Sequence, residues 1–331
     1  MKDEFSFIQS IQPTNHHHPT VITGIGDDAA LYDTDSGYHH IATVDTVVED
    51  IHFSRRTMTP FHIGYKALAV NISDIAAMGG QPLYYLVSIS VPQSGWSEEE
   101  LREIYEGMSE LALKHHVDLI GGDTNSTRDT LVVSVTVIGR VEKGRKLLRS
   151  NAEPGDVVFV TGSIGSSAAG LDYLLKLGLE AETDDRLKSF LRAHQKPEPQ
   201  VKAGRLLAQL NKRVALNDIS DGIASEANEI AEASEVKIEL EYEDLPFDTE
   251  LANESPDDKE QWMLFGGEDF QLIGCVGEEN WTHLKETFAH EGVPLHKVGY
   301  VKEGRTEVML KKDGTRIHLE KRGFNHFNKG D

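Results

Sequence analysis

Six short segments of the sequence place carboxylates directly after apolar residues or glycines. They are Gly26-Asp27-Asp28, Val44-Asp45-Thr46, Ile72-Ser73-Asp74, Gly121-Gly122-Asp123, Asp218-Ile219-Ser220-Asp221 and Gly266-Gly267-Glu268-Asp269. Acids in such positions are costly to gather in one place unless cations neutralise them. Carboxylate oxygens are ligands that Mg²⁺ and similar cations prefer. The pattern therefore predicts a site in which oxygen ligands hold several divalent metals.

The fourth segment illustrates the geometry that we expect. The largely apolar run 117–120 predicts a strand, and Gly121-Gly122 predict that this strand stops at a tight, open turn. Asp123 is then expected to stand on the turn. Because most turns of this kind have no function, the hypothesis depends on the other five segments.

Metal-bound carboxylates beside glycine turns suit phosphoryl transfer, because Mg²⁺ neutralises a triphosphate and leaves its γ-phosphorus open to in-line attack. The sequence has no P-loop and no His-Arg-Asp or Asp-Phe-Gly motif, which excludes P-loop enzymes and protein kinases. The run 24–29 matches Gly-x-Gly-x-x-Ala, but two acids in that turn would repel a pyrophosphate. An acceptor that is already an anion, such as a phosphate monoester, needs little help from a general base.

The charge and composition exclude several other classes of function. A net charge of -22 argues against nucleic acid or an anionic membrane as a partner, since either requires a basic face. The single cysteine, Cys275, excludes an internal disulfide framework and fits a reducing compartment. No run of 18 apolar residues occurs, so we expect no membrane segment and a cytoplasmic protein.

The expected elements alternate between strands and helices. Apolar spacing predicts a helix over 60–78 with Asn71 and Asp74 on one face, and a capping box at Ser97 opens a helix to about residue 115. Further helices are expected over 167–177 and 221–233, and strands over 20–23, 29–32, 40–45, 83–91, 131–141, 156–160, 213–216 and 236–241. This order predicts an α/β fold, with both helices and strands in each half of the chain.

The 331 residues exceed the usual size of a single core, so two domains are expected. The composition changes to Lys, Arg, Gly and Pro between residues 142 and 155, which is typical of a linker. We therefore expect an N-terminal domain over 1–141, a linker over 142–155 and a C-terminal domain over 156–331. Asn71-Ile72-Ser73-Asp74 also resembles Asn217-Asp218-Ile219-Ser220-Asp221, which indicates either chance or two similar halves that supply acids to a shared cleft.

The motifs resemble, nearly end to end and in order, those of the thiamine-monophosphate kinase family. The matching stretches are 24–29, Asp45-Thr46 with His52, 66–79, 120–124, Arg149-Ser150 before Pro154-Gly155-Asp156, 218–222, 266–269 and Gly323-Phe324. The resemblance implies ATP-dependent phosphorylation of thiamine monophosphate to thiamine diphosphate. It also implies the two-domain α/β fold (α+β type, with mixed sheets) of the aminoimidazole ribonucleotide synthetase superfamily. In this fold the N-terminal domains bind ATP and metal and pair in a homodimer.

The same resemblance implies roles for individual residues. Those in metal-ligand positions are Asp28, Thr43, Val44, Asp45, Asp74, Asp123, Asp218 and Asp221, and those in nucleotide positions are Tyr105, Gly122, Asp123, Arg149 and Ser220. His52, Glu268 and Phe324 resemble the contacts to thiamine phosphate. Val44 has no side-chain oxygen and could contribute only its backbone carbonyl. No residue is expected to act as a general base.

Two alternatives remain open from the sequence. One is another ATP-using synthetase of the superfamily, making an aminoimidazole ribonucleotide, a formylglycinamidine or selenophosphate. Selenophosphate synthesis is disfavoured because a reactive N-terminal cysteine would be expected, whereas the thiol present is Cys275. The other is a non-catalytic protein that binds divalent metal or nucleotide.

Overall fold

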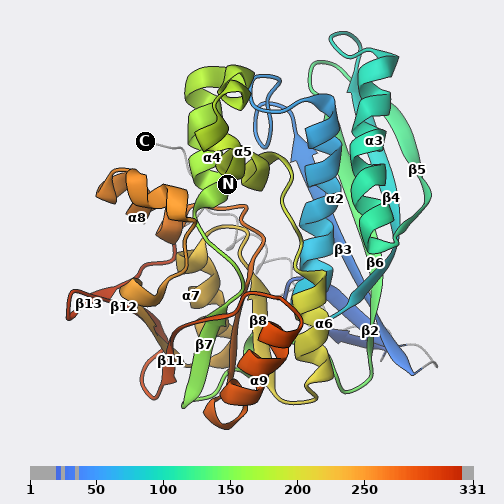
Figure 1. The fold of residues 1–331 in the computed structure, drawn as a ribbon. Coiled ribbons are helices and arrows are strands. Elements are labelled where there is room, and N and C mark those ends of the chain that lie inside the picture. Colours follow the sequence, from blue (N-terminus) through green and yellow to red (C-terminus); the bar gives the residue numbers. More distant parts are fainter. Residues whose placement is uncertain (1–19, 24–26, 34–36, 323–331) are drawn as a thin grey trace.

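A computed structural model of the chain describes residues 20–23, 27–33 and 37–322. The chain forms two β-sheets, each with its own helices, and α2 (Pro60–Ala77) runs along the boundary between them (Figure 1). The first sheet uses strands between residues 21 and 142, and the second uses strands between residues 156 and 318. Both sheets mix parallel and antiparallel pairs, so the predicted mixed α/β fold is confirmed.

Within the described residues the first sheet has six strands, in the order β1-β2-β3-β6-β4-β5. Their bounds are β1 Val21–Thr23, β2 Ala30–Asp33, β3 Tyr38–Val48, β4 Gln81–Pro92, β5 Asp118–Thr127 and β6 Val132–Glu142. Neighbours are antiparallel except β4 and β5, which run parallel. Burial alternates residue by residue along β6, which is typical of a sheet with one face on a core and the other face without helices.

Helices α2 and α3 (Glu98–His115) cover the buried face of the first sheet (Figure 1). The predicted capping box is present, because Ser97 and Glu100 each bond the other's backbone N–H. The two helices approach each other closely at Gly64, where an added Cβ would lie 1.7 Å from the carbonyl oxygen of Ile104. This close packing fixes α2 against α3 as well as against the sheet.

The second sheet has seven strands in the described chain, in the order β13-β12-β9-β11-β7-β10-β8. Their bounds are β7 Asp156–Val160, β8 Val214–Asp218, β9 Lys237–Glu241, β10 Leu272–Gly277, β11 His296–Lys302, β12 Glu307–Lys312 and β13 Thr315–His318. The three neighbouring strands at one end of this sheet, β7, β10 and β8, are buried along their whole length. Such continuous burial requires helices on both faces of this part of the sheet.

The helices around the second sheet are α4 Ser166–Leu177, α5 Lys188–Gln195, α6 Val201–Gln209, α7 Ile223–Ser234, α8 Pro256–Phe265 and α9 Glu278–His290. Helices α6 and α9 pack on one face and α7 packs on the other. Helix α7 begins two residues later than predicted, because Gly222 adopts a φ of +101° that a helix does not allow. Among the described residues, no helix combines the length and the apolar character needed to cross a bilayer.

The predicted turn at Gly121-Gly122-Asp123 is wrong. These residues continue β5, which pairs with β4 from Asp118 to Thr127 and has a one-residue bulge at Ile120. The glycines were misinterpreted because glycine in a strand also permits close approach of a neighbouring backbone. At Gly122 an added Cβ would lie 2.0 Å from the carbonyl oxygen of Val87.

We predict that Gly122→Ala destabilises the protein by about 1–3 kcal/mol, because the methyl group overpacks the contact with β4. Gly121→Ala is the matched control, since its Cβ would meet only a Leu86 methyl group at 3.8 Å. Its expected effect is below about 0.5 kcal/mol. Urea unfolding of both variants measures the difference, and equal stabilities would contradict the packing argument.

Candidate active site

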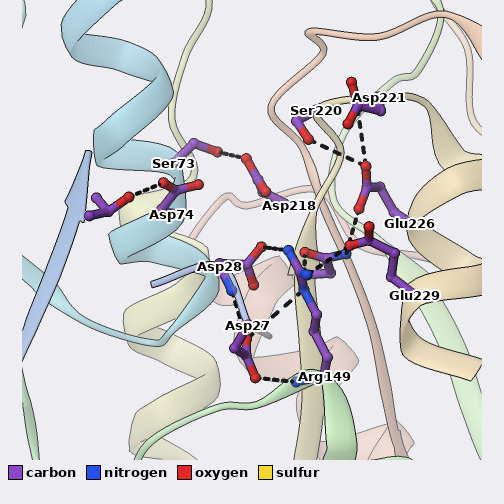
Figure 2. A network of polar contacts seen from close by, with 12 residues as sticks. Asp27, Asp28, Ser73, Asp74, Arg149, Asp218, Ser220, Asp221, Glu226 and Glu229 are labelled. Carbon is purple, nitrogen blue, oxygen red and sulfur yellow. Dashed lines mark hydrogen bonds and ion pairs between the residues drawn. The ribbon is translucent and has the colours of Figure 1, made fainter. Parts of the chain in front are cut away.

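Three carboxylates from distant parts of the chain meet beside α2. Asp28 precedes β2, Asp74 lies on α2 and Asp218 ends β8. Each offers one oxygen, and these three oxygens lie within 4.8 Å of one another. Figure 2 shows Asp74 and Asp218 converging, with Asp28 beside them. We refer to these three residues as the acid cluster.

Helix α2 and strand β3 hold the first-sheet side of the acid cluster. The Thr43 hydroxyl donates to Asp74 Oδ2 at 2.5 Å, and the Asn71 side-chain oxygen accepts from the Asp45 N–H at 3.0 Å. Asn71 and Asp74 therefore share one face of the helix, as their three-residue spacing predicted.

One hydrogen bond joins the two halves of the molecule directly at the cluster. The Ser73 hydroxyl, on α2, donates to Asp218 Oδ2 at 2.6 Å across the boundary between the sheets. The two segments that resemble each other in sequence thus face each other in space. One lies within a helix and the other spans a strand end and loop, so they are not equivalent parts of two similar halves.

Burial dominates the electrostatics of the acid cluster. It raises the pKa of Asp218 to about 8, with the charge of Asp28 adding to the effect. The pKa of Asp74 is raised well above its usual value by burial and then by the neighbouring charges of Asp45 and Asp218. Carboxylates with such pKa values carry their full charge only when a cation compensates them.

Arg149 supplies positive charge at one edge of the cluster. Its guanidinium contacts Asp28 and Glu229, the latter at 2.8 Å, and also donates to the Asn217 side-chain oxygen at 3.1 Å (Figure 2). Burial alone would lower the pKa of Arg149, but the Asp28 and Glu229 carboxylates raise it well above the usual value. Arg149 is therefore cationic and bound to acids in this structure.

Glu226, on α7, organises the loop that follows β8. Its carboxylate accepts hydrogen bonds from the Asn217 side chain at 2.5 Å, from the Ser220 hydroxyl at 3.3 Å and from the Asp221 N–H at 3.1 Å. Its side chain is buried, and burial followed by the charge of Glu229 raises its pKa well above the usual value. The loop that carries Ser220 and Asp221 is thus held by an acid that the sequence analysis did not identify.

The acid cluster fits a divalent cation by the chemistry of its donors. Asp28 Oδ2 is buried and has no hydrogen-bond partner among the described residues. An unsatisfied buried carboxylate oxygen is costly, and a Mg²⁺ ion is the kind of ligand that satisfies it. Asp45 lies next to Asp74, and its own pKa is raised by burial.

Other predicted residues lie away from the acid cluster in this chain. Asp123 is in register with Ser88, which pairs with Ser134, which pairs with Thr46 on β3. Three strand intervals, or about 14 Å at the usual spacing, therefore separate Asp123 from β3. Gly122 lies beside Asp123 on the same strand.

The remaining predicted residues have local roles in this structure. Tyr105 packs against the core of the first sheet, and the Val44 side chain is exposed. The His52 ring accepts a hydrogen bond from the Val48 N–H at 3.1 Å. Phe324 lies outside the described residues.

Glu268 lies in a loop that is bonded to the Ser220 loop. Its N–H donates to the Ser220 carbonyl oxygen at 2.7 Å. The neighbouring Asp269 accepts hydrogen bonds from the N–H groups of Gly165 and Ser167, at 2.6 and 3.0 Å, where α4 begins. The Glu268 side chain reaches across to Lys66 on α2, another contact that the sequence analysis did not predict.

The comparisons with known proteins agree with this architecture. The family model "AIR synthase related protein, N-terminal domain" matches residues 26–141, and "AIR synthase related protein, C-terminal domain" matches residues 153–311. The two sheets and their helices are thus two AIR synthase-related domains.

Similar sequences and structures identify one family within this class of AIR synthase-related proteins. The chain is 55% identical to the thiamine-monophosphate kinase of Bacillus subtilis (strain 168) over 98% of this chain and 99% of the relative. It is 34% identical to that of Escherichia coli (strain K12), over 92% of this chain and 91% of the relative. A solved structure described as AaThiL complexed with AMPPCP and TMP has a TM-score of 0.83 at 30% identity, covering 98% of this chain and 97% of that chain. The chain belongs to the thiamine-monophosphate kinase family, which confirms the resemblance found in its motifs.

The acid cluster predicts a pH dependence for the metal-free protein. Because the folded-state pKa of Asp218 is about 8 against an ordinary 3.8, the folded state binds this proton more tightly than the unfolded state. Its contribution to stability is present at low pH and is lost as pH rises from about 4 to about 8. In chelator, Asp218→Asn should therefore show a smaller loss of melting temperature over this range than the wild type.

The same variant should respond less to Mg²⁺. A cation at about 100 times its Kd stabilises the folded wild type by about 2.7 kcal/mol, and Asp218→Asn removes a ligand charge. Asp129→Asn, at an exposed position, is the control. Thermal melting with and without MgCl₂ measures the gain in stability. An equal gain in Asp218→Asn and wild type would show that Asp218 is not a metal ligand.

Proposed function

We propose that this chain transfers the γ-phosphoryl group of ATP to thiamine monophosphate, giving thiamine diphosphate and ADP by direct in-line transfer. The observation that carries the proposal is the acid cluster held across the two domains of a member of the thiamine-monophosphate kinase family. The solved structure described as complexed with AMPPCP and TMP supports it, because AMPPCP is an ATP analogue and TMP is the abbreviation of thiamine monophosphate. The reaction is the last step in making thiamine diphosphate.

The acid cluster would hold Mg²⁺ through Asp28, Asp74 and Asp218. Thr43, Asp45 and Asp221 are the next candidates, and Val44 could add only its backbone carbonyl. When bound, Mg²⁺ offsets the charge of the two phosphate groups that must approach each other. The chain's own part is to fix these acids: Ser73 bonds Asp218, Thr43 bonds Asp74 and Glu226 holds the Asp221 loop.

The acceptor phosphate explains why the site needs no general base. A phosphate monoester has a second pKa of about 6 and is largely dianionic at pH 7. Its oxygen can attack without losing a proton to the protein. Arg149 and Ser220, beside the cluster, are proposed to contact the nucleotide, while His52, Glu268 and Phe324 are proposed to contact thiamine phosphate.

We propose that the N-terminal domains pair in a homodimer. Among the described residues, one face of the first sheet carries no helix, and Val44, Tyr84, Leu119 and Ile120 are exposed on strands of this sheet. Strand β5 lies at the sheet edge and is exposed along nearly its whole length. An exposed apolar edge of this kind normally has a partner. Gly122 and Asp123 lie on this exposed strand and are proposed to face the second copy, whereas Tyr105 lies on α3, against the core on the other face of the sheet.

We propose an N-terminal domain over 1–141, a linker over 142–155 and a C-terminal domain over 156–331. The positions of the two sheets along the chain support these bounds. A cytoplasmic location is supported by the single buried thiol of Cys275 and by the absence of a spanning helix among the described residues.

The activity is tested by incubating the purified full chain with ATP, Mg²⁺ and thiamine monophosphate. We expect thiamine diphosphate and ADP in equal amounts. If the rate of ADP release does not depend on thiamine monophosphate, another synthetase of the superfamily is favoured. Tight ATP binding without turnover would favour a non-catalytic binding protein. Free thiamine in a parallel reaction tests whether the phosphate is required.

Asp123→Asn is expected to lower kcat/KM at least about tenfold, a loss of 1.4 kcal/mol of transition-state stabilisation. The fold should persist because Asp123 is exposed on β5. Asp129→Asn, on the loop after β5, is the matched control. Near wild-type turnover in Asp123→Asn would count against a role for Asp123.

The dimer is tested by Ile120→Glu, which places a charge at the exposed bulge of β5. Sedimentation of the wild type should give a dimer, and the variant should dissociate at micromolar concentration. Leu175→Glu, equally exposed on α4, is the control and should stay dimeric. A monomeric wild type would overturn the pairing.

A further inference from the structure

Lys66 is a buried cation that none of the roles described above uses. Its side chain is only 3% exposed, because it lies on α2 among apolar core residues. Burial lowers its pKa, and the Glu268 carboxylate opposes that effect. A buried ammonium group requires a partner, and Glu268 Oε2 is the acceptor that Lys66 contacts in the described part of the chain.

Glu268 is held so that its two carboxylate oxygens differ. Oε2 takes the Lys66 contact and lies 3.5 Å from His194 Nδ1. Oε1 accepts no hydrogen bond from the described residues, and the side chain remains 31% exposed. The backbone fixes this arrangement, since Glu268 has a φ of +65° and its N–H is bonded to the Ser220 loop.

His194 does not replace Lys66 as a cation at this position. Its side chain is 2% exposed, and burial followed by the charges of Lys66 and His62 lowers its pKa well below the usual value. Its Nδ1 lies 3.3 Å from the Ser167 hydroxyl. Among the described residues, Lys66 is thus the cation that balances Glu268.

Helix α2 links this pair to the acid cluster. Lys66 and Ser73 are seven residues apart, two turns along one face, so their backbones are about 10.5 Å apart along the axis. Lys66 contacts Glu268 and Ser73 bonds Asp218, and both partners come from the second half of the chain. One rigid helix therefore sets the separation between Glu268 and the acid cluster.

We propose that Lys66 is a positioning residue that holds Glu268 Oε2, so that Oε1 is presented to a hydrogen-bond donor of the thiamine-phosphate substrate at a fixed distance from the acid cluster. This inference rests on the proposed function, because it takes Glu268 to be a substrate contact. It assigns to Lys66 no contact with substrate and no part in the transfer itself.

The test compares Lys66→Met, Lys66→Arg and the control Lys114→Met, in which the lost surface ion pair is with Glu198. We expect Lys66→Met to raise the KM for thiamine monophosphate about tenfold or more, the usual effect of losing a hydrogen bond to a charged group. The KM for ATP should change by less than about twofold, because the acid cluster is intact. Lys66→Arg should recover part of the loss, and Lys114→Met should match the wild type.

Calorimetric titration with thiamine monophosphate alone separates positioning from general damage. A merely structural role would lower the melting temperature and affect ATP and thiamine monophosphate equally, and that result would overturn the inference. If Lys66→Met does not fold, Lys66→Gln, which keeps a donor without the charge, is measured with the same expectation.

A double-mutant cycle distinguishes failure of the inference from failure of the proposed function. In a Glu268→Gln background, Lys66→Met should have little further effect on the KM for thiamine monophosphate, because both act through one contact. A substrate-specific defect in Glu268→Gln without one in Lys66→Met would overturn the inference alone. A wild type that does not turn over thiamine monophosphate would overturn the proposed function instead.

Discussion

The mutual repulsion of buried carboxylates is the constraint on which the rest of the structure depends. Asp28, Asp74 and Asp218 are drawn to within 4.8 Å although burial alone disfavours their charged forms. The acids do not attract one another. Helices and strands that are stabilised by other interactions must therefore hold them in these positions. The hydrophobic cores on either side of α2 supply that stability, and the acids are placed where those cores meet.

Helix α2 is the element that imposes those positions. It is held backbone to backbone on both sides: a Cβ at Gly64 would lie 1.7 Å from Ile104 O, and a Cβ at Gly204 on α6 would lie 2.2 Å from Ala76 O. A helix so fixed cannot shift or rotate without breaking both contacts. Its polar residues therefore meet partners on β3, on β8 and on the Glu268 loop at set distances.

Local patterns predicted the elements well but could not predict which residues meet. The helical spacing of 60–78 and the capping box at Ser97 depend on neighbours in sequence, and both predictions are confirmed. The glycines of β5 were misinterpreted because the reason for Gly122 is the carbonyl of Val87, a residue on another strand. Glu226 and Lys66 were missed for the same reason, since each lies in an ordinary helical pattern and acquires its partner only through the tertiary fold.

The acid cluster and the Lys66–Glu268 pair, which we propose as the two ends of the site, differ in how their negative charge is balanced. At the acid cluster, Arg149 contacts Asp28 but Asp28 Oδ2 keeps no partner in the described chain, so part of the negative charge remains uncompensated. At the other end, Lys66 balances Glu268 one to one and leaves an oxygen that can still accept. An uncompensated cluster attracts a cation strongly, whereas a balanced pair offers directional hydrogen bonding with little net charge. The first arrangement suits a metal that must offset phosphates, and the second suits recognition of an organic ring without adding further repulsion to them.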